Sequence, residues 1–122
     1  MPEFTAPLKV QLCRTCGLSQ LTHTVSPNRL YARYLYCSGV SLEWRAHCER
    51  LAAEYTTVVG RQNRFVVDIA SNDGSLLMPF TGHGYRVLGV EPAENITTIV
   101  PIPTMHAFWS LDIAQQDRKS VV

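Results

Sequence analysis

The sequence lacks a strong excess of charge of either sign, since 11 lysine and arginine residues are balanced by 10 aspartate and glutamate residues. It also lacks a basic stripe with interleaved aromatic residues, which argues against a nucleic-acid partner. No apolar run reaches the roughly 18 residues that a membrane-spanning helix needs. The N-terminus has neither the charged start nor the apolar centre of a signal peptide. We therefore expect a cytoplasmic protein with no membrane partner.

Cysteine is scarce as well, with four residues among 122. In a reducing compartment such cysteines are more often thiols or metal ligands than disulfides. Internal repeats and low-complexity tracts are absent. What the sequence does contain is 46% hydrophobic and 17% charged residues, a balance typical of a globular domain with a buried core rather than of a disordered chain.

A short polar break at residues 60–63 divides the sequence into two parts. Before the break, residues 8–12 alternate between apolar and polar side chains, which predicts a half-buried strand. Ser26 followed by Pro27 is typical of a helix start, and a short helix is expected from there to about Tyr34.

A longer helix is expected from Ser41, which can cap it, to Gly60, which can end it. Glu43 would complement the positive end of this helix. Its apolar residues recur at spacings of three and four, which predicts one stripe that packs on the following domain. The stripe consists of Trp44, Cys48, Leu51, Tyr55 and Val58.

After the break the pattern predicts a strand, a turn, a helix and a second strand. Residues 65–69 are a continuous apolar strand with an acid near its end. A helix is expected over residues 75–80 and a second strand over residues 85–90. Such a βαβ unit implies a parallel sheet and an α/β fold. A short helix over residues 93–100 and a loop around residues 101–103 are expected to follow.

The turn between the first strand and its helix is the candidate binding element, because open α/β sheets bind ligands at the carboxyl ends of their strands. Its small residues would let a ligand approach the backbone closely, and Asn72 and Gly74 tolerate positive φ. The carboxylates of Asp68 and Asp73 would repel a diphosphate. They suit a ligand that carries an ammonium and a sulfonium group, as S-adenosylmethionine does.

Glu91 ends the second strand. Its separation in sequence from Asp68 is close to the roughly 20 residues expected for an acid that binds ribose hydroxyls. Other interpretations remain open: Asp73 as a helix cap, Asp68 as a partner of nearby backbone amides, and Glu91 as an exposed strand-end carboxylate. The residues predicted to bind the cofactor are Asp68, Ala70, Ser71, Asn72, Asp73, Gly74, Glu91 and Pro92.

These segments resemble the class I S-adenosylmethionine-dependent C-methyltransferases of deoxysugar biosynthesis. The resemblance covers roughly residues 8–112. It is carried by Cys13–Leu21, Tyr34–Ser41, Val67–Leu77, Gly84–Asn95, Ile102–Thr104 and Phe108–Ser110.

The resemblance implies methyl transfer to a carbon beside the keto group of a nucleotide-linked sugar. It also implies a partial Rossmann-like sheet, preceded by a small cysteine-bearing segment and a linking helix. Residues 1–40 would be a remnant of a zinc-binding domain, residues 41–60 the linking helix, and residues 61–122 the first part of the cofactor-binding domain. Tyr34 and Tyr36 would border the active site, although ordinary packing also explains them. The family's candidate bases lie further downstream, so no catalytic residue is assigned.

The zinc-binding domain of the family uses two Cys-x-x-Cys pairs, and Cys13 and Cys16 match only the second. Structural zinc takes four ligands. Cys37, Cys48 and His23 are the nearby candidates for the remaining two, so bound zinc is possible.

The segment after Asn95 is shorter than in the family, which casts doubt on its helix. Two or three strands fall short of a seven-stranded methyltransferase sheet. We therefore expect a piece of an enzyme that needs the missing remainder or a second copy as partner. The alternatives are a non-catalytic interaction module with an inert cofactor turn and a fragment of a nucleotide-sugar oxidoreductase; the acidic turn disfavours the latter.

Overall fold

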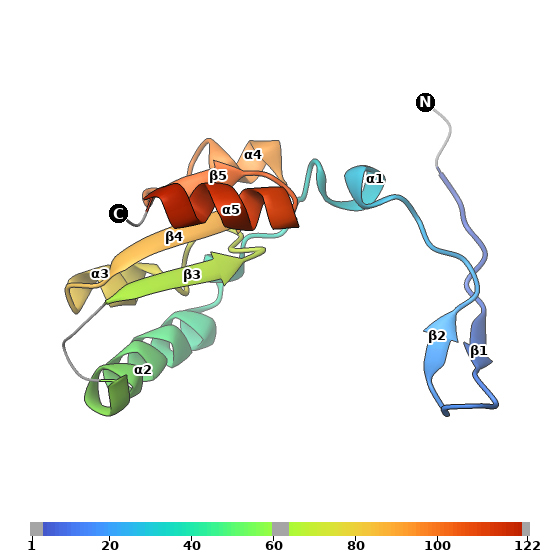
Figure 1. Ribbon diagram of the computed structural model, residues 1–122, viewed down its shortest axis with the longest axis horizontal. Coiled ribbons are helices and arrows are strands. Elements are labelled where there is room, and N and C mark those ends of the chain that lie inside the picture. Colours follow the sequence, from blue (N-terminus) through green and yellow to red (C-terminus); the bar gives the residue numbers. More distant parts are fainter. Residues whose placement is uncertain (1–3, 60–63, 121–122) are drawn as a thin grey trace.

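A three-stranded parallel sheet with flanking helices makes up most of the molecule, and a separate hairpin precedes it (Figure 1). The computed structural model describes residues 4–59 and 64–120. In chain order the elements are β1 (Val10–Leu12), β2 (Ser19–Leu21), α1 (Pro27–Tyr31), a 3₁₀ turn (Ser38–Val40), α2 (Leu42–Val59), β3 (Phe65–Ile69), α3 (Met78–Gly82), β4 (Arg86–Glu91), α4 (Glu94–Thr97), β5 (Thr104–His106) and α5 (Leu111–Ser120).

The sheet has the strand order β3-β4-β5, and both strand pairs are parallel. Val66 is opposite Val87, and Gly89 is opposite Thr104. The carboxyl ends of all three strands therefore lie at one edge of the sheet. The predicted α/β fold with a parallel βαβ unit is confirmed, and it is compatible with part of a Rossmann-like fold.

The hydrophobic core lies between the sheet and the helices α2 and α3. It contains Ala52, Leu77, Phe80, Tyr85 and Val87, with Val66 and Ile102 packed against it. The rings of Phe80 and Tyr85 meet edge to face with centroids 5.5 Å apart, a geometry that adds about 0.5–1.5 kcal/mol beyond the area it buries. This core holds β3, β4 and the turn between them in place.

Helix α2 begins as predicted, because the Ser41 hydroxyl accepts a hydrogen bond from the Trp44 backbone N–H at 3.1 Å. The predicted stripe packs on the following unit, where the Tyr55 ring meets the Phe80 ring edge to face with centroids 6.2 Å apart, but most of it is not buried. Cys48 and Ala52 are the buried residues of α2, whereas Trp44, Tyr55 and Val58 are exposed. The small side chains of an i, i+4 pair make the close contact, and the larger side chains flank it. The predicted stop at Gly60 lies outside the described residues.

Strands β1 and β2 form an antiparallel hairpin in which Val10 is opposite Leu21. Figure 1 shows this hairpin projecting away from the α/β unit. The predicted strand over residues 8–12 is present as β1, but the prediction that it is half buried is wrong, because all residues of both strands are exposed, including Val10 and Leu12. The alternation of apolar and polar residues is real, but the apolar side chains of β1 remain exposed.

Three predicted helices are shorter than expected. Helix α1 ends at Tyr31, and the Ser26 side chain forms no capping bond. Helix α3 begins only at Met78, because residues 75–77 continue the turn and Pro79 favours the first helical turn. Helix α4 ends at Thr97, within a run of β-branched residues that weakens helices. None of the helices in the described ranges is long and apolar enough to cross a membrane.

Candidate functional site

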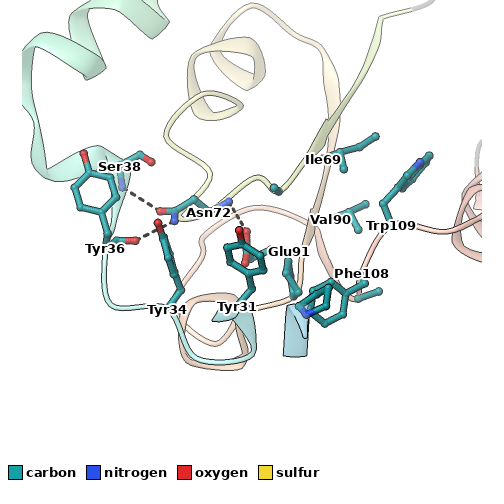
Figure 2. A pocket seen from close by; sticks show the side chains of 14 residues that line it. Tyr31, Tyr34, Tyr36, Ser38, Ile69, Asn72, Val90, Glu91, Phe108 and Trp109 are labelled. Atoms are coloured by element: carbon teal, nitrogen blue, oxygen red, sulfur yellow. Dashed lines mark hydrogen bonds between the residues drawn. The ribbon is translucent and has the colours of Figure 1, made fainter. Parts of the chain in front are cut away.

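A cavity of about 540 Å³ lies at the carboxyl ends of β3 and β4 (Figure 2). Its size is within the range of small-molecule sites, about 300–1,000 Å³. The lining residues are Pro27, Tyr31, Tyr34, Tyr36, Ser38, Ile69, Ala70, Asn72, Val90, Glu91, Pro92, Ala107, Phe108 and Trp109. Five of these fourteen are aromatic, so the walls offer flat apolar surfaces around few polar groups.

The turn after β3 winds across the end of β4 through alternate positive-φ residues. Ala70 has φ 62°, Asn72 49° and Gly74 74°. The backbone N–H groups of Ala70 and Ser71 both donate to the Val90 carbonyl, at 2.8 and 3.3 Å. The sequence indicated positive φ at Asn72 and Gly74 only. Alanine carries no signal for this conformation, which costs an L-residue about 1–2 kcal/mol.

Glu91 is buried, with 5% of its surface exposed, so the interpretation as an exposed strand-end carboxylate is wrong. One carboxylate oxygen accepts the backbone N–H of Asn72 at 2.8 Å, and the other accepts that of Ala93 at 2.8 Å. The carboxylate thus joins the turn after β3 to the loop after β4. A carboxylate offers about four acceptor positions, which leaves capacity for ligand hydroxyls.

The other two acids lie away from the cavity lining. Asp68 follows Val66 by two residues and so projects to the side of the sheet that holds α2. Burial raises the pKa of the Asp68 carboxyl, and the nearby charge of Glu91 raises it further. The Asp73 carboxylate accepts the backbone N–H of Gly39 at 2.7 Å and that of Ser75 at 3.2 Å. Asp73 therefore orders the chain around the turn. The interpretation of Asp73 as a helix cap is wrong, because the N-cap of α3 is Leu77 and no side chain caps it.

Of the eight residues predicted to bind the cofactor, the structure places four on the cavity wall: Ala70, Asn72, Glu91 and Pro92. The other four do not line the cavity: Asp68 belongs to β3, and Ser71, Asp73 and Gly74 belong to the turn after it. Ser71 is buried beside Gly89, where a Cβ atom would collide with it. A Cβ atom on Gly74 would lie 2.9 Å from Ile102.

One wall of the cavity comes from α1 and from the segment between α1 and α2. The Asn72 side chain accepts the Ser38 backbone N–H at 3.0 Å and donates to the Tyr36 carbonyl at 2.9 Å. The Asn95 side chain accepts the Tyr34 N–H at 3.0 Å and donates to the Tyr34 carbonyl at 2.8 Å. These two amides bring the tyrosines of the segment to the cavity, where Figure 2 shows Tyr31 and Tyr34 side by side.

The opposite wall comes from the loop after β5. Phe108 and Trp109 line the cavity and remain 37% and 42% exposed. The His106 ring bonds to the Pro92 carbonyl at 3.0 Å, which ties β5 to the loop after β4. The pattern of residues in the sequence predicted no role in the site for Phe108 and Trp109. Two adjacent aromatic residues in a loop, rather than within a helical stripe, were the signal available for it.

The cysteines do not form a metal site among the described residues. Cys13 lies at the end of β1 and Cys16 in the hairpin turn, where the backbone N–H groups of Cys16 and Thr15 lower the pKa of Cys13. No group of three or more histidine, cysteine, aspartate or glutamate side chains in the described ranges is arranged to hold a metal ion. Two thiols do not fit a closed four-ligand zinc site.

Comparison with known proteins gives one informative similarity. No family model matches the sequence. Over 118 residues the chain is 29% identical to the C-methyltransferase NovU of Streptomyces niveus, and the alignment covers 93% of this chain. It covers 28% of the relative, so the chain spans just over a quarter of that protein's length. The similarity supports a methyltransferase family.

Proposed function

We propose that the cavity binds S-adenosylmethionine and that the chain is the cofactor-binding part of a sugar C-methyltransferase. The observation that carries the proposal is the buried Glu91 carboxylate, which lies between aromatic walls at the carboxyl end of a parallel sheet. The similarity to a C-methyltransferase supports the reaction class.

The donor set fits the cofactor. Each Glu91 oxygen has one backbone partner and keeps a free acceptor position for a ribose hydroxyl. The aromatic walls suit stacking with adenine and attract a sulfonium cation to their faces. Because Asp68 and Asp73 do not line the cavity, the tyrosine and tryptophan faces would take over the role first expected of those two carboxylates.

The substrate belonging to this proposal is a nucleotide-linked keto sugar. When bound, the cofactor supplies an electrophilic methyl group for the carbon beside the keto group. The described residues would bind and orient the adenosine and keep water from it. A base that removes the α-proton, and donors that hold the developing enolate oxygen, are further requirements of such a reaction. They would come from a partner: the remainder of the enzyme or a second copy.

The domain assignment belongs to the same proposal. Residues 61–122 would be the first part of the cofactor-binding domain, with residues 41–60 as linking helix and residues 1–40 as remnant of a zinc-binding domain. The tyrosines that line the cavity all lie within residues 1–40. Cofactor binding would therefore depend on residues on both sides of α2.

Calorimetric titration of the chain with S-adenosylmethionine, and with NAD as control, tests the proposal. We expect heat with the first ligand only. The Glu91→Gln variant should bind about tenfold or more weakly, because an amide offers one acceptor oxygen where the carboxylate offers two. Glu54→Gln, an exposed position on α2, is the matched control and should bind as the wild type does.

Tryptophan emission provides a readout that survives a change in stability. Trp109 lines the cavity, whereas the Trp44 ring nitrogen donates to the Ser75 hydroxyl at 3.0 Å, outside the cavity lining. S-adenosylmethionine should change the emission of the wild type and of Trp44→Phe, and should leave Trp109→Phe unchanged. A response in Trp109→Phe equal to that of the wild type would show that the ligand binds elsewhere.

A further inference from the structure

The Asn95 side chain makes two hydrogen bonds to the backbone of Tyr34, a residue that lines the cavity. Its side-chain amide accepts the Tyr34 N–H and donates to the Tyr34 carbonyl, so it pairs with one residue's backbone as a neighbouring strand would. The two residues are 61 positions apart in the chain. The Glu94 backbone N–H adds a bond to the Ala32 carbonyl at 3.1 Å. These contacts hold the segment that carries Tyr31 and Tyr34 against the start of α4.

The same short loop carries the buried acid of the cavity. Glu91 accepts the backbone N–H of Ala93, and α4 begins at the next residue. The chain from Glu91 to Asn95 thus spans from the cavity carboxylate to the tyrosine wall. A change at Asn95 would alter the position of that wall while leaving the Glu91 contacts in place.

We infer that Asn95 is a positioning residue for the cavity ligand: it sets the distance between the tyrosine wall and Glu91, and thereby the affinity for adenosine-containing ligands. The inference rests on the proposed function, since the ligand probe is S-adenosylmethionine. Asn95 does not line the cavity and acts through Tyr34. Removing its hydrogen-bonding groups or charging its side chain should therefore weaken binding without removing any ligand contact.

The Asn95→Asp variant gives a test with an internal switch. An ionised carboxylate can accept the Tyr34 N–H but opposes the Tyr34 carbonyl oxygen with a second acceptor. A protonated carboxyl group has one donor and one acceptor, as the amide pair does. The leucine side chain of Asn95→Leu has neither a donor nor an acceptor at any pH. Asn28→Asp adds the same charge at an exposed position of α1 and serves as the control.

Affinity for S-adenosylmethionine is measured relative to the wild type at each pH, with circular dichroism confirming that every variant is folded. At about pH 8 we expect Asn95→Asp and Asn95→Leu to bind about tenfold more weakly, and Asn28→Asp within twofold. Toward about pH 5 the deficit of Asn95→Asp should shrink to about threefold, whereas that of Asn95→Leu should persist. A general loss of structure would not produce this difference between the two variants.

Two results overturn the inference: wild-type affinity in Asn95→Asp at about pH 8, or the same pH response in both Asn95 variants. Failure of the wild type to bind S-adenosylmethionine would instead overturn the proposed function, together with the inferred effect of Asn95 on affinity. Hydrogen exchange without ligand then still tests whether Asn95 holds the Tyr34 backbone. The Tyr34 amide should exchange faster in Asn95→Leu than in the wild type, and equal rates would contradict the role of the Asn95 side chain in holding the Tyr34 backbone.

Discussion

Two non-glycine residues in the turn after β3 adopt the left-handed backbone conformation. Ala70 lies at φ 62° and Asn72 at 49°. Asparagine is among the residues that adopt this region most readily, and here its amide also bonds to the segment before α2. The Ala70 side chain can form no such bond. Surrounding contacts must therefore hold the strained conformation of Ala70, and one of them is the bond from its own N–H to the Val90 carbonyl.

Ala70→Gly should stabilise the protein by about 0.5–1 kcal/mol. Relief of the strain in the left-handed conformation stabilises the folded state by about 1–2 kcal/mol. The greater entropy of glycine in the unfolded chain offsets about 0.5–1 kcal/mol of this gain. The free energy of unfolding in urea is the measurement. Ala53→Gly, at an exposed position within α2, is the control and should lower stability by about 1 kcal/mol. Equal losses in both variants would contradict the strain at Ala70.

Asp68 predicts a dependence of stability on pH. Its folded-state pKa is raised, first by burial and then by the charge of Glu91. A raised carboxyl pKa means that the folded state binds the proton more tightly than the unfolded state does. The resulting stabilisation is complete below the ordinary aspartate pKa and is lost as the pH rises through the raised value.

Asp68→Asn should therefore be more stable than the wild type at neutral pH, and its advantage should shrink as the pH falls through the raised pKa. Thermal unfolding at a series of pH values between about 4 and 7 measures this difference. Asp112→Asn changes an exposed acid in the first turn of α5 and should show no such gain at neutral pH. A constant difference between Asp68→Asn and the wild type across this range would argue against the raised pKa.

At the scale of elements, the 3₁₀ turn before α2 is fastened to the turn after β3. Gly39 is buried there, its N–H donates to Asp73, and its carbonyl accepts the Arg45 guanidinium. A Cβ atom on Gly39 would lie 2.9 Å from the Asp73 carboxylate and 3.2 Å from the Ser75 Cβ. The cavity wall and the turn therefore depend on close packing between two elements that are distant in sequence.

Gly39→Ala should lower stability by about 1 kcal/mol, because the Asp73 carboxylate must move and its bond to residue 39 weakens. Gly82→Ala is the matched control, since nothing lies within 4 Å of the added Cβ atom at the end of α3. The control should be neutral or stabilising, by up to about 1 kcal/mol. The free energy of unfolding in urea is measured for both variants. A Gly39→Ala variant as stable as Gly82→Ala would rule out the close contact between residue 39 and Asp73.

At the scale of the whole molecule, the hairpin β1–β2 and the α/β unit differ in how they are stabilised. The α/β unit has a buried core. In the hairpin, Leu8, Val10, Leu12 and Leu21 all remain exposed. An isolated two-stranded hairpin is at best marginally stable in water. The two parts should therefore open independently.

Amide hydrogen exchange should separate these two parts. Amides of β4, the central strand, should exchange through global unfolding, whereas those of β1 and β2 should exchange through local opening that costs little free energy. We expect rates in the hairpin at least about a hundredfold faster than in β4. Comparable protection in the two parts would show that the hairpin is covered by something in solution, for example a second copy.

The sequence by itself determined the elements whose signals are local: the limits of β3, the start of α2, the parallel βαβ unit and the position of Glu91 at a strand end. These follow from periodicity and turn chemistry within a few residues. Only the tertiary structure decided that Asp68 projects toward α2 and that Glu91 is buried. It also decided that Asn95 holds Tyr34 across 61 positions. The physical reason is that pairing between distant segments depends on how they pack, which no local pattern encodes.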